Sequence, residues 1–213
     1  MDELKLAEYF IERDSVRHVI FKDAKIIQDI RYDDIVNGEG IRVSIWVSGC
    51  CFRCPGCFNK EAWEYNSGRP FTDKDLKDII DYLNNPLIDG ITILGGEPLA
   101  IPYHFNEKVF SDENLFTIKN NTLTMCPFNK NNALTMFLCS IAKELGKNTW
   151  VYTGATNEEL MEYKTIYKPV LELIDVLVDG RFEEDKKDLS LPFRGSRNQR
   201  LLHLKNGEIV HDI

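Results

Sequence analysis

The residues best suited to chemistry are cysteines, four of which lie within eight positions of the stretch 49–59. Thiolates this close in sequence can converge on one soft-metal centre, either zinc or an iron–sulfur cluster. One possible spacing, Cys51, Cys54 and Cys57, reads C-x2-C-x2-C and begins like a bacterial ferredoxin sequence. That sequence requires a fourth cysteine where Glu61 stands.

The other possible spacing uses Cys50, Cys54 and Cys57 and reads C-x3-C-x2-C, with no fourth ligand. A cluster held by three cysteines keeps one iron free for a small molecule. An iron that no cysteine binds is required at a catalytic centre, where it binds a small molecule, but not at a structural centre. The spacing alone leaves both sets of cysteines possible.

A zinc knuckle is the structural alternative, and a closed zinc site requires four ligands. The remaining cysteines and the histidines do not stand at ligand spacing from the loop: Cys126, Cys139, His18, His104, His203 and His211. Disulfides are not favoured, because the sequence shows no secretory signal. The roles of Cys51, Cys126 and Cys139 stay open.

Composition limits the class of protein. The chain has 213 residues, of which 43% are hydrophobic, enough for one domain with a sizeable core. A net charge of −8 argues against nucleic acid as a partner. No apolar run is long enough to span a bilayer, so we expect a cytoplasmic protein with no membrane partner.

Strands must position the cysteine loop and the other unusual motifs. The loop follows an alternating strand at 41–48, and three further predicted strands end in Gly95-Gly96-Glu97-Pro98, Thr153-Gly154 and Asp179-Gly180. Helices are predicted at 73–84, at 132–145 and after Thr156, the last divided from a second short helix by Pro169. This alternation predicts an α/β fold with a mainly parallel sheet, whose ligands bind at the carboxyl ends of the strands.

The remaining segments are predicted to support this sheet. Residues 2–12 suggest an amphipathic helix, and 16–21 with 25–30 suggest a strand pair. Asn206-Gly207 predicts a hairpin between 200–204 and 208–211. Residues 101–131 are long for a connection within an α/β unit, so they indicate an insertion, with a hairpin formed by 115–118 and 122–125.

Several motifs together resemble the radical S-adenosylmethionine superfamily and, within it, the activating proteins of anaerobic ribonucleoside-triphosphate reductases. They occur in the family's order, and they are Asp34-Ile35-Val36-Asn37-Gly38-x-Gly40-x-Arg42, Cys54-Pro55-Gly56-Cys57-Phe58-Asn59, Gly95-Gly96-Glu97-Pro98, Trp150-x-Tyr152-Thr153-Gly154, Val178-Asp179-Gly180 and Arg194-Gly195-Ser196-x-Asn198-Gln199-Arg200. The resemblance implies a partial, open βα barrel of the radical S-adenosylmethionine type, with helices outside. The resemblance also implies that residues 1–213 form a single domain, with an N-terminal extension at 1–31 and an insertion at 101–131.

The resemblance also implies the chemistry. A [4Fe–4S] cluster held by Cys50, Cys54 and Cys57 would bind S-adenosylmethionine and receive an electron from reduced flavodoxin or ferredoxin. Reductive cleavage would give a 5′-deoxyadenosyl radical, which abstracts hydrogen from a glycine of the large reductase subunit and leaves a glycyl radical. The cluster and S-adenosylmethionine carry the reaction, so no side chain is expected to be catalytic.

The contacts to S-adenosylmethionine follow from the same resemblance. Gly56 and Phe58 are expected on the adenine side, and the methionine end should meet Gly95, Gly96 and Glu97. Thr153, Gly154 and Asp179 are expected to complete the pocket, although Thr-Gly and Asp-Gly are also ordinary turn sequences. Residues 194–200 either dock the substrate or hold the last strand. Two alternatives remain: an activase of another glycyl-radical enzyme such as a formate-lyase, and a non-catalytic, metal-stabilised binding module.

Overall fold

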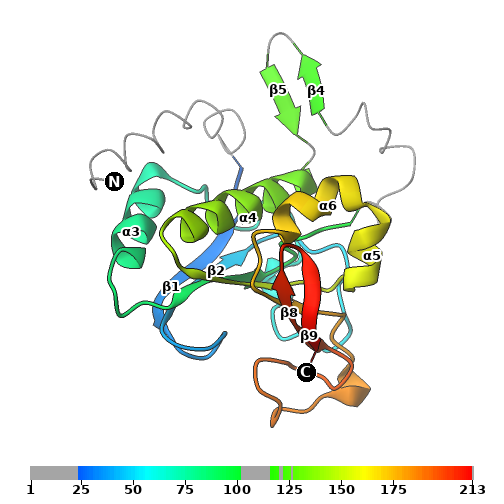
Figure 1. The fold of residues 1–213 in the computed structure, drawn as a ribbon. Helices are drawn as coiled ribbons and strands as arrows, with labels where there is room; N and C mark the ends of the chain where they lie inside the picture. Colours follow the sequence, from blue (N-terminus) through cyan, green and yellow to red (C-terminus); the bar gives the residue numbers. More distant parts are fainter. Residues whose placement is uncertain (1–23, 102–115, 120–121, 126, 213) are drawn as a thin grey trace.

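The computed structural model describes residues 24–101, 116–119, 122–125 and 127–212, and its main feature is a seven-stranded sheet (Figure 1). The strands lie in the order β1-β2-β3-β6-β7-β8-β9. Their bounds are Ile27–Asp34, Arg42–Val47, Gly90–Gly95, Asn148–Tyr152, Val176–Asp179, Arg200–Lys205 and Glu208–Asp212.

The sheet is parallel at its centre and antiparallel at both edges. The pairs β2–β3, β3–β6 and β6–β7 are parallel, whereas β1–β2, β7–β8 and β8–β9 are antiparallel. The prediction of an α/β fold is confirmed, but the sheet is only partly parallel. It is also not closed: among the described residues, β1 and β9 each pair with another strand on one side only. No α-helix crosses over between the antiparallel pairs: a loop connects β1 to β2, a long loop with the 3-10 helix Glu184–Lys186 connects β7 to β8, and a tight turn connects β8 to β9.

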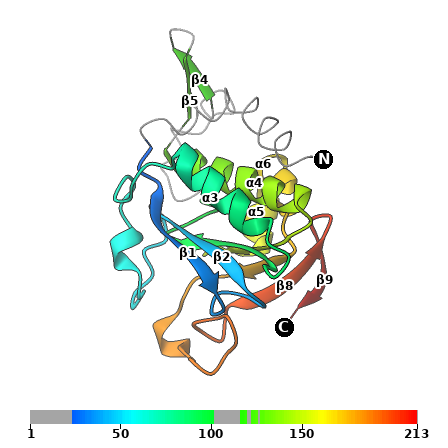
Figure 2. The same cartoon turned by 90° about the vertical axis from the view of Figure 1, so that its left-hand side faces the viewer.

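Helices cover one face of the sheet, as the two perpendicular views show (Figures 1 and 2). Their bounds are Asp73–Leu83 for α3, Pro127–Glu144 for α4, Asn157–Glu162 for α5 and Lys164–Leu171 for α6. Capping boxes begin α3 and α5, with Thr72 bonded to Asp75 and Thr156 bonded to Glu159, as the sequence predicts.

The break between the last two helices differs from the prediction. It falls at Tyr163, whose backbone leaves the helical region with φ −114° and ψ 44°. Pro169 lies inside α6 instead of dividing two helices. Because proline lacks an N–H, Pro169 costs this short helix one hydrogen bond. The helix nevertheless continues to Leu171.

The two faces of the central strands differ in chemistry. Val43, Ile45 and Val47 belong to the main hydrophobic core, which they share with α3 and α4. The alternate residues of β2 face the other side, where Arg42 and Ser44 are also buried. Alternation along β2 therefore reflects one apolar side and one mixed side with Arg42, Ser44 and Trp46, both of them buried.

Two hairpins form where the sequence predicts them. Asn206 and Gly207 connect β8 to β9 with φ values of 54° and 76°, as a tight hairpin turn requires. A second hairpin joins β4, Phe116–Lys119, to β5, Thr122–Met125, and stands beyond the helical layer (Figure 2).

Other expectations fall on segments that the structure leaves out. The predicted helix at 2–12 and strand at 16–21 lie outside the described residues, as does Cys126. Strand β1 begins within the predicted strand at 25–30 and pairs with β2. Within the described part of the chain, no helix is long and apolar enough to cross a membrane.

Candidate cluster and cofactor site

The cysteine loop begins where β2 ends and is anchored by backbone hydrogen bonds at its start. The N–H of Gly49 donates to the carbonyl of Ala62 at 2.7 Å, and that of Cys50 donates to Trp63 at 3.0 Å. Gly49 has φ 94°, and a Cβ there would lie 2.2 Å from the ring of Tyr65. The glycine before the first cysteine is therefore required by both conformation and space.

The cysteines of the loop are free thiols that differ in exposure. Cys50 is buried, whereas Cys51, Cys54 and Cys57 are half-buried. Burial raises the pKa of the Cys50 thiol to about 12, and the carboxylate of Glu97 acts in the same direction. Burial likewise raises the pKa of Cys51 and of Cys54. A metal cation that binds cysteine thiols displaces their protons.

The described residues contain no group of three or more His, Cys, Asp or Glu side chains that could hold a single metal ion. A closed zinc site requires four ligands, whereas three cysteines suffice for an iron–sulfur cluster with one open iron. Cys139 is completely buried in α4 and belongs to the hydrophobic core.

The Gly95-Gly96-Glu97 turn at the end of β3 lies directly against the start of the cysteine loop. The N–H of Gly96 donates to Val47 at 2.7 Å, and that of Glu97 donates to Gly49 at 2.8 Å. A Cβ on Gly95 would lie 2.6 Å from the backbone nitrogen of Val47. The glycines thus allow two backbones to approach more closely than side chains would permit.

The Glu97 carboxylate joins the ends of β3 and β6. Its Oε1 accepts hydrogen bonds from Thr153 Oγ1 at 2.7 Å and from Leu99 N at 2.8 Å, and its Oε2 accepts one from Gly154 N at 2.7 Å. Only 1% of the residue is exposed. Burial raises the pKa of Glu97 to about 7, although these three hydrogen bonds lower it. Glu97, Thr153 and Gly154, which the sequence associates, are therefore in direct contact.

Phe52 and Arg181 extend the same site, although sequence reasoning did not select them. A Cβ on Gly154 would lie 2.5 Å from the ring of Phe52, so the loop packs directly on the end of β6. The Arg181 guanidinium lies 4.5 Å from the centre of that ring and pairs with Glu159 at 2.8 Å. Two features of the sequence could have identified them. Phe52 lies within the cysteine motif, and Arg181 directly follows Asp179-Gly180.

Gly56 and Phe58, expected on the adenine side, lie in the outer part of the loop. Gly56 has φ 72°, and a Cβ there would lie 2.5 Å from the carboxyl carbon of Glu184. Glu184 belongs to the short 3-10 helix Glu184–Lys186. Phe58 is 92% exposed, so its ring has little protein contact and is open to a ligand or partner.

Asp179 lies at the same edge of the sheet, and its carboxylate is held by protein donors. It accepts hydrogen bonds from Asn157 N at 2.7 Å and from Arg200 Nε at 2.9 Å. Arg200 also pairs with Glu158 at 2.6 Å. The hydrogen bonds that Arg200 donates to Asp179 and Glu158 raise its pKa above the ordinary value. The carboxylate therefore ties β7 to β8 and to the first turn of α5.

The segment 194–200 folds back on the chain that follows β7. Asn198 Nδ2 donates to the carbonyl of Arg181 at 2.7 Å, and Gln199 Nε2 donates to that of Gly180 at 3.1 Å. Gln199 Oε1 accepts from Gly195 N at 2.9 Å. These contacts support the role of this motif in holding the last strands.

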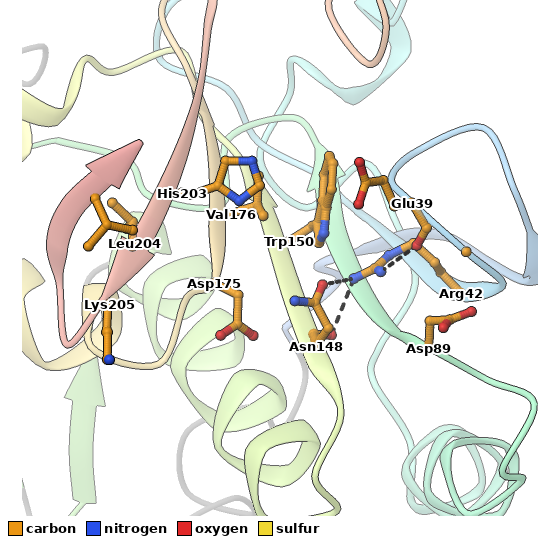
Figure 3. Close-up of a pocket in the computed structure, with 12 residues that line it drawn as sticks. Glu39, Arg42, Asp89, Asn148, Trp150, Asp175, Val176, His203, Leu204 and Lys205 are labelled. Carbon is orange, nitrogen blue, oxygen red and sulfur yellow. Dashed lines mark hydrogen bonds between the residues drawn. The ribbon is translucent and has the colours of Figure 1, made fainter. Parts of the chain in front are cut away.

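A separate cleft of about 590 Å³ lies at the opposite, amino ends of the parallel strands (Figure 3). Its inner wall includes Arg42, which donates to Thr92 Oγ1 at 2.7 Å, to the Glu39 carbonyl at 2.9 Å and to Asn148 Oδ1 at 3.1 Å. Burial lowers the pKa of Arg42 to about 10. Arg42 therefore ties the first residues of three strands together, away from the cysteines.

Comparison with known proteins assigns the class of this site. Residues 36–112 and 122–202 match a protein family described as a 4Fe-4S single cluster domain. The matched ranges include the cysteine loop, the Gly-Gly-Glu turn and the ends of β6 and β7. The fold and the site thus define a protein with a single [4Fe–4S] cluster.

Curated relatives define the family more narrowly. An anaerobic ribonucleoside-triphosphate reductase-activating protein of Escherichia coli K12 is 39% identical over 174 residues, which cover 81% of this chain and 94% of the relative. Proteins of the same name from Haemophilus influenzae and phage T4 are 32% and 29% identical, over 81% and 84% of this chain and 94% of each relative. The chain belongs to the family of anaerobic ribonucleoside-triphosphate reductase-activating proteins.

Proposed function

We propose that this protein activates an anaerobic ribonucleoside-triphosphate reductase by installing a glycyl radical on the large reductase subunit. The observation that carries the proposal is the contact between a three-cysteine loop and a Gly-Gly-Glu turn at the ends of neighbouring parallel strands. Family membership gives this arrangement its chemistry. The open sheet with helices on one face supports a partial βα barrel of the radical S-adenosylmethionine type. In this proposal, residues 1–213 form one such domain.

Cys50, Cys54 and Cys57 would hold the cluster, and Cys51 would remain outside it. When bound, the cluster would pass on the electron for cleavage of S-adenosylmethionine to methionine and a 5′-deoxyadenosyl radical, and this radical would remove a hydrogen atom from the reductase glycine. A reduced flavodoxin or ferredoxin is the proposed electron donor. The loop's three positions of positive φ, at Gly49, Arg53 and Gly56, turn the chain repeatedly, which gives a short segment several directions for its thiols.

In this proposal, the side chains and backbone of the protein bind S-adenosylmethionine, orient it and shield it from water. Gly95 and Gly96 bring backbone close to the loop, and we propose that the amino and carboxylate groups of methionine bind beside this contact. Glu97 is buried there and its pKa is raised to about 7, so its ionised form would favour an ammonium group beside it. Thr153 and Gly154 fix the orientation of this carboxylate. We propose Gly56 and Phe58 for the adenine side, with Asp179 supporting the pocket through Arg200.

The test is 5′-deoxyadenosine formation by anaerobically reconstituted, reduced protein supplied with S-adenosylmethionine and the cognate reductase. We expect product with wild type and with Cys51→Ala, and none with Cys54→Ala. Cys51→Ala is the matched control because it removes a half-buried thiol from the same loop. Product from Cys54→Ala, or loss of cluster iron in Cys51→Ala, would refute the proposed ligand set. A zinc-loaded protein without sulfide would favour a binding module.

A further inference from the structure

Side chains of α4 hold the backbone that follows the Gly-Gly-Glu turn. Thr135 Oγ1 donates to the carbonyl of Pro98 at 3.2 Å, and Asn132 Nδ2 reaches that of Ala100 at 3.4 Å. Asn131 Nδ2 donates to the carbonyl of Glu97 at 3.0 Å. The same amide group of Asn131 also donates to the carbonyl of Ser48 at 2.9 Å. Asn131 thus contacts both the turn after β3 and the residue that opens the cysteine loop.

The orientation of the Asn131 amide is fixed by these two acceptors. If its nitrogen and oxygen were exchanged, the oxygen would face two carbonyl oxygens, which is unfavourable. The residue is completely buried. Its Oδ1 is also buried and finds no hydrogen-bond partner among the described residues. Among the described residues, this side chain therefore contributes the two hydrogen bonds that its amide group donates.

The two carbonyls lie beside the backbone contacts that join the loop to the turn. Ser48 is two residues before Cys50, and its neighbour Gly49 accepts the hydrogen bond from Glu97 N at 2.8 Å. Without Asn131, two buried carbonyls would lose their donor next to this contact. The amide therefore acts as a third tie between two segments that otherwise share two backbone hydrogen bonds.

We propose that Asn131 is a positioning residue that sets the cysteine loop at a fixed distance and angle from the Gly-Gly-Glu turn. It thereby aligns the open iron with the methionine end of S-adenosylmethionine. That the loop binds a cluster and the turn binds S-adenosylmethionine rests on the proposed function. That Asn131 holds the loop against the turn does not. Asn131 acts through the loop and the turn and needs no contact with either ligand.

The mechanical role is tested by amide hydrogen exchange on the metal-free protein. We compare wild type with Asn131→Ala, with Asn131→Asp, which keeps the shape and removes the amide donor, and with Asn132→Ala as control. Asn132 is the next residue on α4 and contacts Ala100 but not the loop. We expect exchange at 95–99 to be about tenfold faster in both Asn131 variants, as loss of two buried hydrogen bonds implies, and unchanged in Asn132→Ala.

Two outcomes of this exchange experiment would overturn the proposal. Wild-type protection in Asn131→Asp would mean that only the shape of the side chain matters. Equal acceleration in Asn132→Ala would mean general loosening of α4. If Asn131→Asp does not fold, the comparison of Asn131→Ala with Asn132→Ala still decides the result.

The alignment is tested on reconstituted protein by the change that S-adenosylmethionine causes in the electron paramagnetic resonance spectrum of the reduced cluster. We expect Asn131→Ala to keep its iron content but to need about tenfold more S-adenosylmethionine for half of the spectral change. Asn132→Ala should titrate like wild type. An unchanged titration in Asn131→Ala would contradict the alignment. A wild-type protein whose spectrum does not respond would instead refute the proposed function, while the exchange result would still stand.

Discussion

Replacing Gly96 with alanine should separate the cysteine loop from the Gly-Gly-Glu turn. The added Cβ would lie 2.4 Å from the carbonyl oxygen of Gly49 and 2.9 Å from that of Ala62. Both obstacles are backbone atoms, so no side-chain rotation relieves the clash. The backbone must move, and the hydrogen bond from Glu97 N to Gly49 O, now 2.8 Å long, is the contact that breaks.

The expected cost combines two terms. Overpacking of this kind costs about 1–3 kcal/mol, and one lost backbone hydrogen bond costs about 1 kcal/mol, which gives about 2–4 kcal/mol together. For a domain of this size, each kcal/mol lowers the melting temperature by about 2–4 °C, so Gly96→Ala should melt about 4–16 °C lower. It should also retain less iron after reconstitution, since the cysteines move with the loop.

Gly146→Ala is the matched control. Gly146 ends α4 with φ 68°, and an added Cβ there meets no atom within 4 Å. It should cost about 1 kcal/mol through backbone strain alone and leave the iron content unchanged. Far-ultraviolet circular dichroism gives both melting temperatures, and iron analysis gives the occupancy. If Gly96→Ala has the same melting temperature as Gly146→Ala and holds a full complement of iron, the argument from close packing is refuted.

Two further predictions concern charged groups that stabilise the fold, at the start of α3 and at the end of β7. Burial alone would raise the pKa of Asp75, but hydrogen bonds from Arg69 and Thr72 bring it below its ordinary value of 3.8. A carboxyl with a lowered pKa stabilises the folded state above its unfolded pKa and loses this effect as the pH falls. Urea titrations should therefore show Asp75→Asn less stable than wild type at pH 7, with the difference shrinking below about pH 4; a pH-independent difference would contradict this. Asp179→Asn should lower the free energy of unfolding by about 2 kcal/mol, less than a fully buried pair would, because Arg200 is 31% exposed and keeps its pairing with Glu158; an unchanged urea midpoint would be the contrary result.

Local signals in the sequence predicted local structure well. The capping boxes at Thr72 and Thr156 begin helices, and Asn206-Gly207 forms a hairpin turn, because each depends on neighbours within a few residues. The gathering of the cysteine loop and Glu97 at one edge was also predictable, since the carboxyl ends of adjacent parallel strands must meet.

Features that depend on distant partners were not predictable in the same way. The sheet is antiparallel at both edges because β1 and β8 join their neighbours through connections without a crossover helix, which periodicity does not distinguish from crossovers. Pro169 is tolerated within α6, so a strong local signal was misleading there. Asn131 gives no sequence signal, because its two acceptors, Ser48 and Glu97, lie 83 and 34 positions away. Whether Gly56, Phe58 and Asp179 meet S-adenosylmethionine remains a prediction.

The most direct test of the account is the electron paramagnetic resonance spectrum of the cognate reductase after anaerobic incubation with the reconstituted, reduced protein and S-adenosylmethionine. We expect a glycyl-radical signal on the large reductase subunit, present with wild type and absent with Cys54→Ala. A protein that carries a full [4Fe–4S] cluster and cleaves S-adenosylmethionine, yet leaves the reductase without a radical, would contradict it. A radical that appears instead on a formate-lyase would assign the same chemistry to a different partner.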